Sequence, residues 1–166
     1  TGAAAATAAS WVSASSGYDE VGETWIPTVM VRRQAQAEPL VSTFVSVIEP
    51  YEGKPLIRSV RRLALRDSAG AALPDGDVAL EIVLADGRRD ILVGADRAGR
   101  PAREPGSTVS LEAVGLRTDA ELLLLRIGQD GRLDKVALSR GTFVEAGDTR
   151  IKLDGPVGFL EISLDN

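Results

Sequence analysis

The apolar and polar residues of this chain alternate with period two through most of its length, which is typical of β-strands. In the segment 78–84 every second residue is a large aliphatic one, and in 108–114 aliphatic residues alternate with Ser and Glu. The run Leu122 to Leu125 is apolar at every position and predicts a strand buried on both faces. No segment of helical length combines a sustained 3.6-residue period with capping residues, so the pattern predicts β-structure throughout.

Turn-forming residues divide this pattern into short pieces. Asp86-Gly87 and Asp130-Gly131 predict hairpins with two-residue loops, because both positions tolerate positive φ. The predicted strands are 28–32, 40–49, 56–66, 78–84, 89–93, 108–114, 121–127, 133–138, 142–145, 149–153 and 157–164. The segment 40–49 is rich in β-branched residues and predicts a covered central strand.

Regularly spaced short strands of this kind predict an all-β fold, an antiparallel β-sandwich of about ten or eleven short strands. Residues 1–22 are expected to be an irregular lead-in, since Ser and Gly interrupt any periodicity there. Residues 23–166 are expected to form a single β-sandwich domain, and a chain of 166 residues suits one domain.

Composition narrows the functional classes. The chain contains neither Cys nor His, so it lacks thiolate chemistry, the commonest general base and the commonest metal ligand. We therefore predict no catalytic residue, no metal and no cofactor. The net charge of −5 disfavours nucleic acid as a partner, and no apolar stretch approaches the ~20 residues that span a bilayer.

One part of the sequence resembles a known family. Pro27-Thr-Val-Met-Val-Arg-Arg33, Phe44-Val-Ser-Val-Ile-Glu-Pro-Tyr51, Gly53 and Ile57-Arg-Ser-Val60 are similar to the C-terminal β-sandwich region of heparinase II/III-like polysaccharide lyases of bacteria. The resemblance is specific between residues 27 and 60, and the strand pattern extends it more weakly.

The resemblance implies a parent protein with an α/α-toroid followed by antiparallel β-sheets. It implies proton abstraction beside a uronate carboxylate and β-elimination, carried out by a Tyr and a His, mostly in the toroid and the first β-domain. This chain has no His and no toroid, so no family catalytic residue can be carried onto it. The resemblance therefore leads us to expect a non-catalytic accessory domain, itself not an enzyme, which supports the catalytic toroid and β-domain of its parent chain.

The same resemblance implies that the protein is bacterial and is periplasmic or extracellular. The opening Thr1 to Ser10 is small and featureless, and two interpretations are open. The favoured one is a boundary inside a longer protein, and the other is the small-residue tail of a signal peptide.

The candidate carbohydrate-binding residues are Arg58, Arg62, Arg66 and Trp25. The three arginines lie at every fourth residue, a multiple of the strand period of two, so they are expected on one strand face. Their guanidinium groups can bind uronate carboxylates of an anionic polysaccharide, but a solvated outer face or pairing with acidic neighbours is the favoured interpretation. Trp25 can stack on a sugar ring or plug the core or an edge.

Two further motifs have structural interpretations. At Glu49-Pro50-Tyr51 we favour a strand corner over a proton donor, and Asp75-Gly76-Asp77 is expected to be a turn.

Two other functions stay open. A stand-alone carbohydrate-binding module would show an arginine row with a flanking aromatic residue in a groove. A protein–protein interaction sandwich, like an accessory domain, would show an exposed apolar patch larger than ~400 Å².

Overall fold

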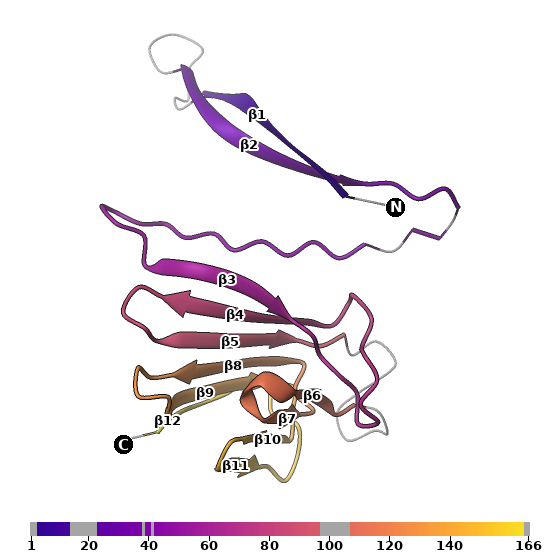
Figure 1. The fold of residues 1–166 in the computed structure, drawn as a ribbon, viewed down its shortest axis with the longest axis vertical. Helices are drawn as coiled ribbons and strands as arrows, with labels where there is room; N and C mark the ends of the chain where they lie inside the picture. Colours follow the sequence, from indigo (N-terminus) through magenta and orange to yellow (C-terminus); the bar gives the residue numbers. More distant parts are fainter. Residues whose placement is uncertain (1–2, 14–22, 38, 41, 97–106, 165–166) are drawn as a thin grey trace. The chain divides into compact units, whose positions relative to one another are not determined.

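The computed structural model describes residues 3–13, 23–37, 39–40, 42–96 and 107–164 (Figure 1). The chain divides into two compact units, Thr1–Ser42 and Thr43–Asn166. Each unit is described below by itself.

The first unit contains an antiparallel ribbon. Strand β1 (Ala3–Ser13) pairs with β2 (Glu23–Arg33) along its whole length, from Ala3 opposite Arg33 to Ser13 opposite Glu23. β1 lies in the segment expected to be irregular. It is rich in Ala, which has little preference for strands, so its partner β2 rather than its own composition accounts for the extended conformation.

The second unit contains two antiparallel sheets. The larger has the order β12-β9-β8-β5-β4-β3, and the smaller has the order β11-β10-β7-β6. The strands of the larger sheet are β3 (Ile57–Leu63), β4 (Val78–Leu84), β5 (Arg89–Gly94), β8 (Leu122–Ile127), β9 (Leu133–Ser139) and β12 (Leu160–Ser163). Those of the smaller are β6 (Val109–Leu111), β7 (Leu116–Thr118), β10 (Phe143–Ala146) and β11 (Thr149–Lys152), with a 3₁₀ turn at Glu112–Val114 between β6 and β7. The all-β antiparallel sandwich predicted from the sequence is confirmed.

The core lies between these two sheets. From the larger sheet Ile91, Leu125 and Val136 point inward, and from the smaller sheet Val109 and Val144 point toward them; all five are at most 1% exposed. Inner residues alternate with outer ones along each strand, as the pleat requires. No helix in the part of the chain described here is long and apolar enough to cross a membrane.

The two Asp-Gly hairpins form as predicted, but each loop has three residues instead of two. In the first, Leu84 N donates to Arg88 O at 2.9 Å, which leaves Ala85, Asp86 and Gly87 in the loop. Gly87 has φ of 90°, a left-handed conformation that closes the turn with a one-residue bulge. The Asp130-Gly131 hairpin has the same bonding pattern, from Gly128 N to Arg132 O at 2.8 Å.

The pKa of Asp86 is lowered from its ordinary value, chiefly because the backbone N–H of Arg88 donates to its carboxylate, aided by the Arg88 guanidinium. A carboxyl group whose pKa is depressed on folding stabilises the fold above its unfolded pKa, and loses that effect as pH falls through the folded pKa. We therefore expect Asp86→Asn to destabilise the protein at neutral pH and to have a smaller effect in acid. Urea denaturation at both pH values measures the difference, and an equal effect at both would contradict it.

The segment 43–49 differs from the covered central strand that was expected. It is extended beside β3 in Figure 1 but forms no strand, and Phe44 and Ile48 are well exposed. Its end is fixed by Glu49, whose Oε1 accepts hydrogen bonds from Leu56 N at 2.6 Å and Ile57 N at 2.8 Å. The Glu49-Pro50-Tyr51 motif is thus a corner in which Glu49 orders the loop before β3.

Candidate functional site

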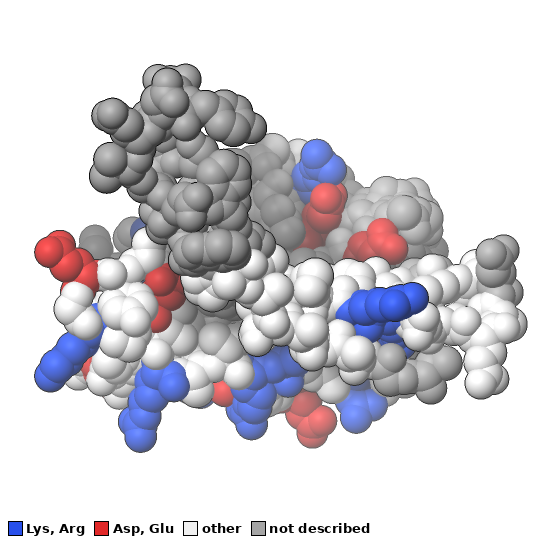
Figure 2. All heavy atoms as spheres, turned by 90° about the horizontal axis from the view of Figure 1, so that it is seen from above, with Lys and Arg blue, Asp and Glu red and all other residues white. Residues whose placement is uncertain are grey.

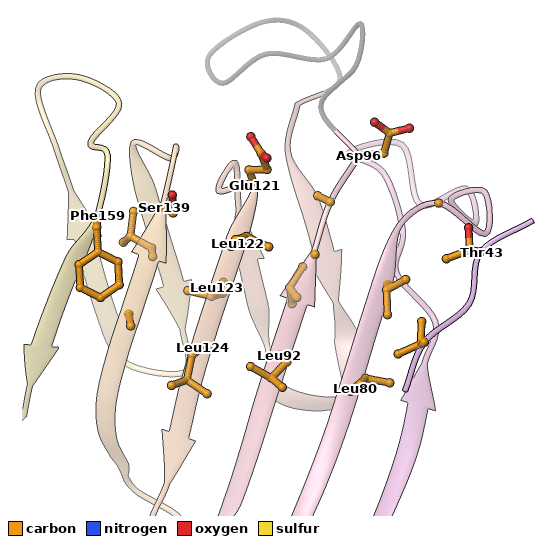
Figure 3. Close-up of a pocket in the computed structure, with 18 of the residues that line it drawn as sticks. Thr43, Leu80, Leu92, Asp96, Glu121, Leu122, Leu123, Leu124, Ser139 and Phe159 are labelled. Atoms are coloured by element: carbon orange, nitrogen blue, oxygen red, sulfur yellow. The ribbon is translucent and has the colours of Figure 1, made fainter. Parts of the chain in front are cut away.

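An apolar hollow of about 900 Å³ lies on the outer face of the six-stranded sheet, the face turned away from the smaller sheet. Figure 3 shows side chains from neighbouring strands pointing into it. Across the sheet, Leu80 lies opposite Leu92, Leu92 opposite Leu124, and Leu124 opposite Ala137. These four residues form one continuous apolar row.

A second row explains why the surface is hollowed. Gly94 lies opposite Val78 on one side and Leu122 on the other. Because Gly94 has no side chain, a notch remains between its two neighbours. A Cβ built on Gly94 would be 3.8 Å from Leu122 Cδ2, an ordinary contact, so the notch has room for the first carbon of a side chain at this residue.

The hollow is open to solvent. Leu92 and Leu122 are 36% and 56% exposed, and Phe159 at one side is 68% exposed. On the opposite side the segment 43–46 brings Phe44 to the rim. Large exposed side chains gathered around one concavity are unusual for a free surface and mark sites of contact with another molecule.

Polar groups border the hollow at the loop end of the strands, where Figure 3 places Glu121 and Asp96. The Glu121 carboxylate forms an ion pair with the Arg140 guanidinium at 3.0 Å. The backbone N–H of Asp96 donates to Asp77 Oδ1 at 3.0 Å, which fixes the backbone at Asp96. The described residues that line the hollow include no Lys, Arg or Tyr. The lining is mainly apolar and suits the burial of apolar surface.

The structure does not assemble the predicted arginines into a row. A bulge between Ile57 and Ser59 displaces Arg58 from the regular pleat, which interrupts the alternation on which the prediction rests. Arg62 Nη2 donates to Asp75 O at 2.9 Å, and Arg66 Nη1 donates to Gly70 O at 2.8 Å beyond the end of β3. Two of the three guanidinium groups are therefore engaged in holding loops.

The structure describes only some of the remaining candidate residues. Trp25 lies in β2, but its side chain is outside the described residues, and so are the loop residues 97–106. Asp75 and Asp77 flank a turn, where Asp77 N donates to Pro74 O at 3.0 Å. Within the described residues, no three acidic side chains come close enough together to hold a metal ion.

Charge forms no single large patch among the described residues on the face seen in Figure 2, where basic and acidic side chains are interspersed among uncharged ones. Many form pairs, such as Arg126 with Asp90 at 2.8 Å, a bidentate contact that raises the pKa of the Arg126 guanidinium. The apolar hollow therefore stands out from its surroundings by its chemistry.

This hollow was not predicted from the sequence, although a signal was present. The run Leu122 to Leu125 is apolar at residues facing both sides of the sheet, which predicted a strand buried on both faces. In β8 the inner residues Leu123 and Leu125 are buried, whereas Leu122 on the outer side is exposed. A doubly apolar strand can thus indicate a surface whose partner is another molecule or domain.

Searches against family models, curated proteins and solved structures found no match to this chain.

Proposed function

We propose that this chain is a non-catalytic accessory β-sandwich that docks, through the hollow on its six-stranded sheet, onto the catalytic toroid and β-domain of a heparinase II/III-like polysaccharide lyase. The observation that carries the proposal is the pair of apolar rows around Gly94, from Val78 to Leu122 and from Leu80 to Ala137, in which Leu92 and Leu122 are exposed. Burying one Leu side chain contributes about 1.5–3 kcal/mol, so covering this face would hold a partner firmly.

The identity of the partner rests on the resemblance between residues 27 and 60. In that family a β-sandwich follows the catalytic domains in the same polypeptide, so the occupant of the hollow would be the catalytic part of the parent. The absence of His and Cys from the chain and the apolar lining agree with an accessory role. On this proposal the protein works outside the bacterial cytoplasm, on uronic-acid polysaccharides.

The first test is the complete open reading frame and the protein it encodes. The encoded protein should release unsaturated uronate from alginate or a heparin-like polymer, measured by ultraviolet absorbance, and this chain alone should not. A reading frame without a toroid region, or lyase activity from this chain alone, would overturn the proposal.

A variant tests the surface itself. Gly94→Leu places a large side chain in the notch, and we expect it to leave the stability of this chain alone unchanged or to raise it by up to about 1 kcal/mol, because a glycine within a strand is destabilising. In the complete protein it should block close packing and lower the free energy of unfolding by roughly 1–3 kcal/mol, the usual cost of overpacking.

Leu56→Ser is the matched control, because Leu56 is 67% exposed and does not line the hollow. It should have a similarly small effect in both proteins. Urea denaturation of all four variant proteins gives the comparison, and an equal effect of Gly94→Leu in the two contexts would exclude this face as the docking surface.

A further inference from the structure

The outer face of the smaller sheet carries a second concavity, a groove of about 720 Å³ that is chemically different from the apolar hollow. Its walls include Arg117 of β7, Glu145 and Phe143 of β10, and Arg150 and Lys152 of β11. Strand alternation explains this composition, because Val144 and Ile151 between them point into the core.

The register of the sheet brings the charges together. Glu145 lies directly opposite Arg117 on one neighbouring strand and Arg150 on the other. Lys152 follows on the same face of β11, opposite Phe143. The lining thus holds three cations and two carboxylates, Glu145 and the buried Asp119, so the groove has a local excess of one positive charge within a chain whose net charge is −5.

Two of these cations are available to a ligand. Arg117 Nη1 contacts Glu145 Oε2 at 2.8 Å, but the side chains of Arg150 and Lys152 are exposed and form no ion pair or hydrogen bond with any residue that the structure describes. Neighbouring strands are ~4.8 Å apart and residues i and i+2 of a strand ~6.6 Å, so the three cations are spread over roughly 10 Å. One carboxylate cannot contact them all, whereas a polymer with repeated anionic groups can.

We propose that this groove binds a segment of an acidic polysaccharide. Arg117 and Arg150 would take carboxylate or sulfate oxygens in forked hydrogen bonds, and Lys152 would bind a further anionic group. Phe143, half-buried between them, offers an apolar surface to the face of a sugar ring. The inference stands on this geometry alone and goes beyond the docking role, which concerns the other sheet.

The floor of the groove is rigid, which suits recognition. Asp119, only 1% exposed, accepts hydrogen bonds from Thr142 N at 2.7 Å and Phe143 N at 3.1 Å. These bonds fix the start of β10 and with it the position of Phe143. A preorganised site loses less side-chain freedom on binding.

The test is a titration of this chain with an alginate oligosaccharide, which carries only carboxylates, and with a heparin oligosaccharide, which adds sulfates. Calorimetry at low salt should detect binding that weakens as salt is added. The double variant Arg150→Ala/Lys152→Ala should lose affinity about tenfold or more, since contacts to charged groups are strong. Because both side chains are exposed, circular dichroism should show an unchanged fold.

The matched control is Lys54→Ala/Arg132→Ala, which removes the same charge from exposed residues outside the groove. It should retain affinity within about twofold, because the interaction is local. A third variant, Glu145→Gln, removes the competing carboxylate and should strengthen binding severalfold.

Several outcomes would overturn the inference. One is an equal loss of affinity in the Lys54→Ala/Arg132→Ala control, and another is weaker binding of the acidic oligosaccharides by the Glu145→Gln variant. The others are binding of a neutral glucan, or of single-stranded DNA, with the same affinity as the acidic oligosaccharides. Absence of binding to both acidic oligosaccharides at low salt would mean that Arg150 and Lys152 only protect the edge strand β11 from pairing with other chains.

Discussion

Asp119→Ala is expected to lower the free energy of unfolding of this protein by about 3 kcal/mol or more, because it removes the acceptor for two buried hydrogen bonds and one partly buried one. Asp119 Oδ1 accepts from Thr142 N and Phe143 N, and Oδ2 accepts from Thr142 Oγ1 at 2.6 Å. Alanine would leave the two backbone N–H groups without this partner in a region that water reaches poorly. Each unsatisfied buried group costs about 1–3 kcal/mol.

Two variants separate this effect from a simple change of charge. Asp119→Asn keeps one carbonyl oxygen as an acceptor and should cost about half as much as the alanine variant. Asp130→Ala removes an acidic group that also accepts a backbone N–H, that of Arg132 at 3.0 Å, but its side chain is 59% exposed, so its effect should stay below about 1 kcal/mol. Urea denaturation provides all three values, and a loss for Asp119→Ala no larger than that for Asp130→Ala would contradict the prediction.

The fold could be predicted from the sequence because its signals are local. Period-two alternation and Asp-Gly turns lie within a few residues of each other, and they predict strands and hairpins without knowledge of distant partners. The three-residue loops at Gly87 and Gly131 were mistaken for two-residue ones, since the same dipeptide serves both turn types.

The role of each sheet face could not be predicted, because alternation identifies two faces without saying which is covered. In β4 the large residues Leu80 and Ile82 lie on the outer face, while the small Ala79 points into the core. The choice depends on where the second sheet packs, which is a long-range property. For the same reason the segment 43–49, apolar in sequence, was expected inside and is exposed.

The two candidate sites depend on register between strands far apart in the sequence. The groove needs Arg117 opposite Glu145, a pairing across 28 residues, and the hollow needs Leu92 opposite Leu124. The arginine row, in contrast, was predicted from one strand alone. The prediction assumed strict alternation along that strand, and a single bulge at Arg58 interrupts the alternation.

Gly141→Ala is the second substitution for which we expect a large effect, about 3 kcal/mol, because a Cβ there has no room. Built on Gly141, it would lie 2.6 Å from Ala120 Cα, 2.7 Å from Ala120 Cβ and 3.0 Å from Ala120 N. Backbone atoms cannot move aside as a flexible side chain can, so the two segments must separate, and overpacking of this kind costs about 1–3 kcal/mol or more. Separation would also stretch the hydrogen bonds from Thr142 and Phe143 to Asp119.

Gly158→Ala is the matched control, since nothing lies within 4 Å of its Cβ position. It should be neutral or stabilise by a few tenths of a kcal/mol, because alanine restricts the unfolded chain. The double variant Asp119→Ala/Gly141→Ala should be less destabilised than the two single effects added, because both break the same contact between residues 119–120 and 141–143. If the two losses of unfolding free energy are fully additive in urea denaturation, Gly141 and the Asp119 carboxylate act independently. That result would contradict the view that a single contact between these two segments fixes the start of β10.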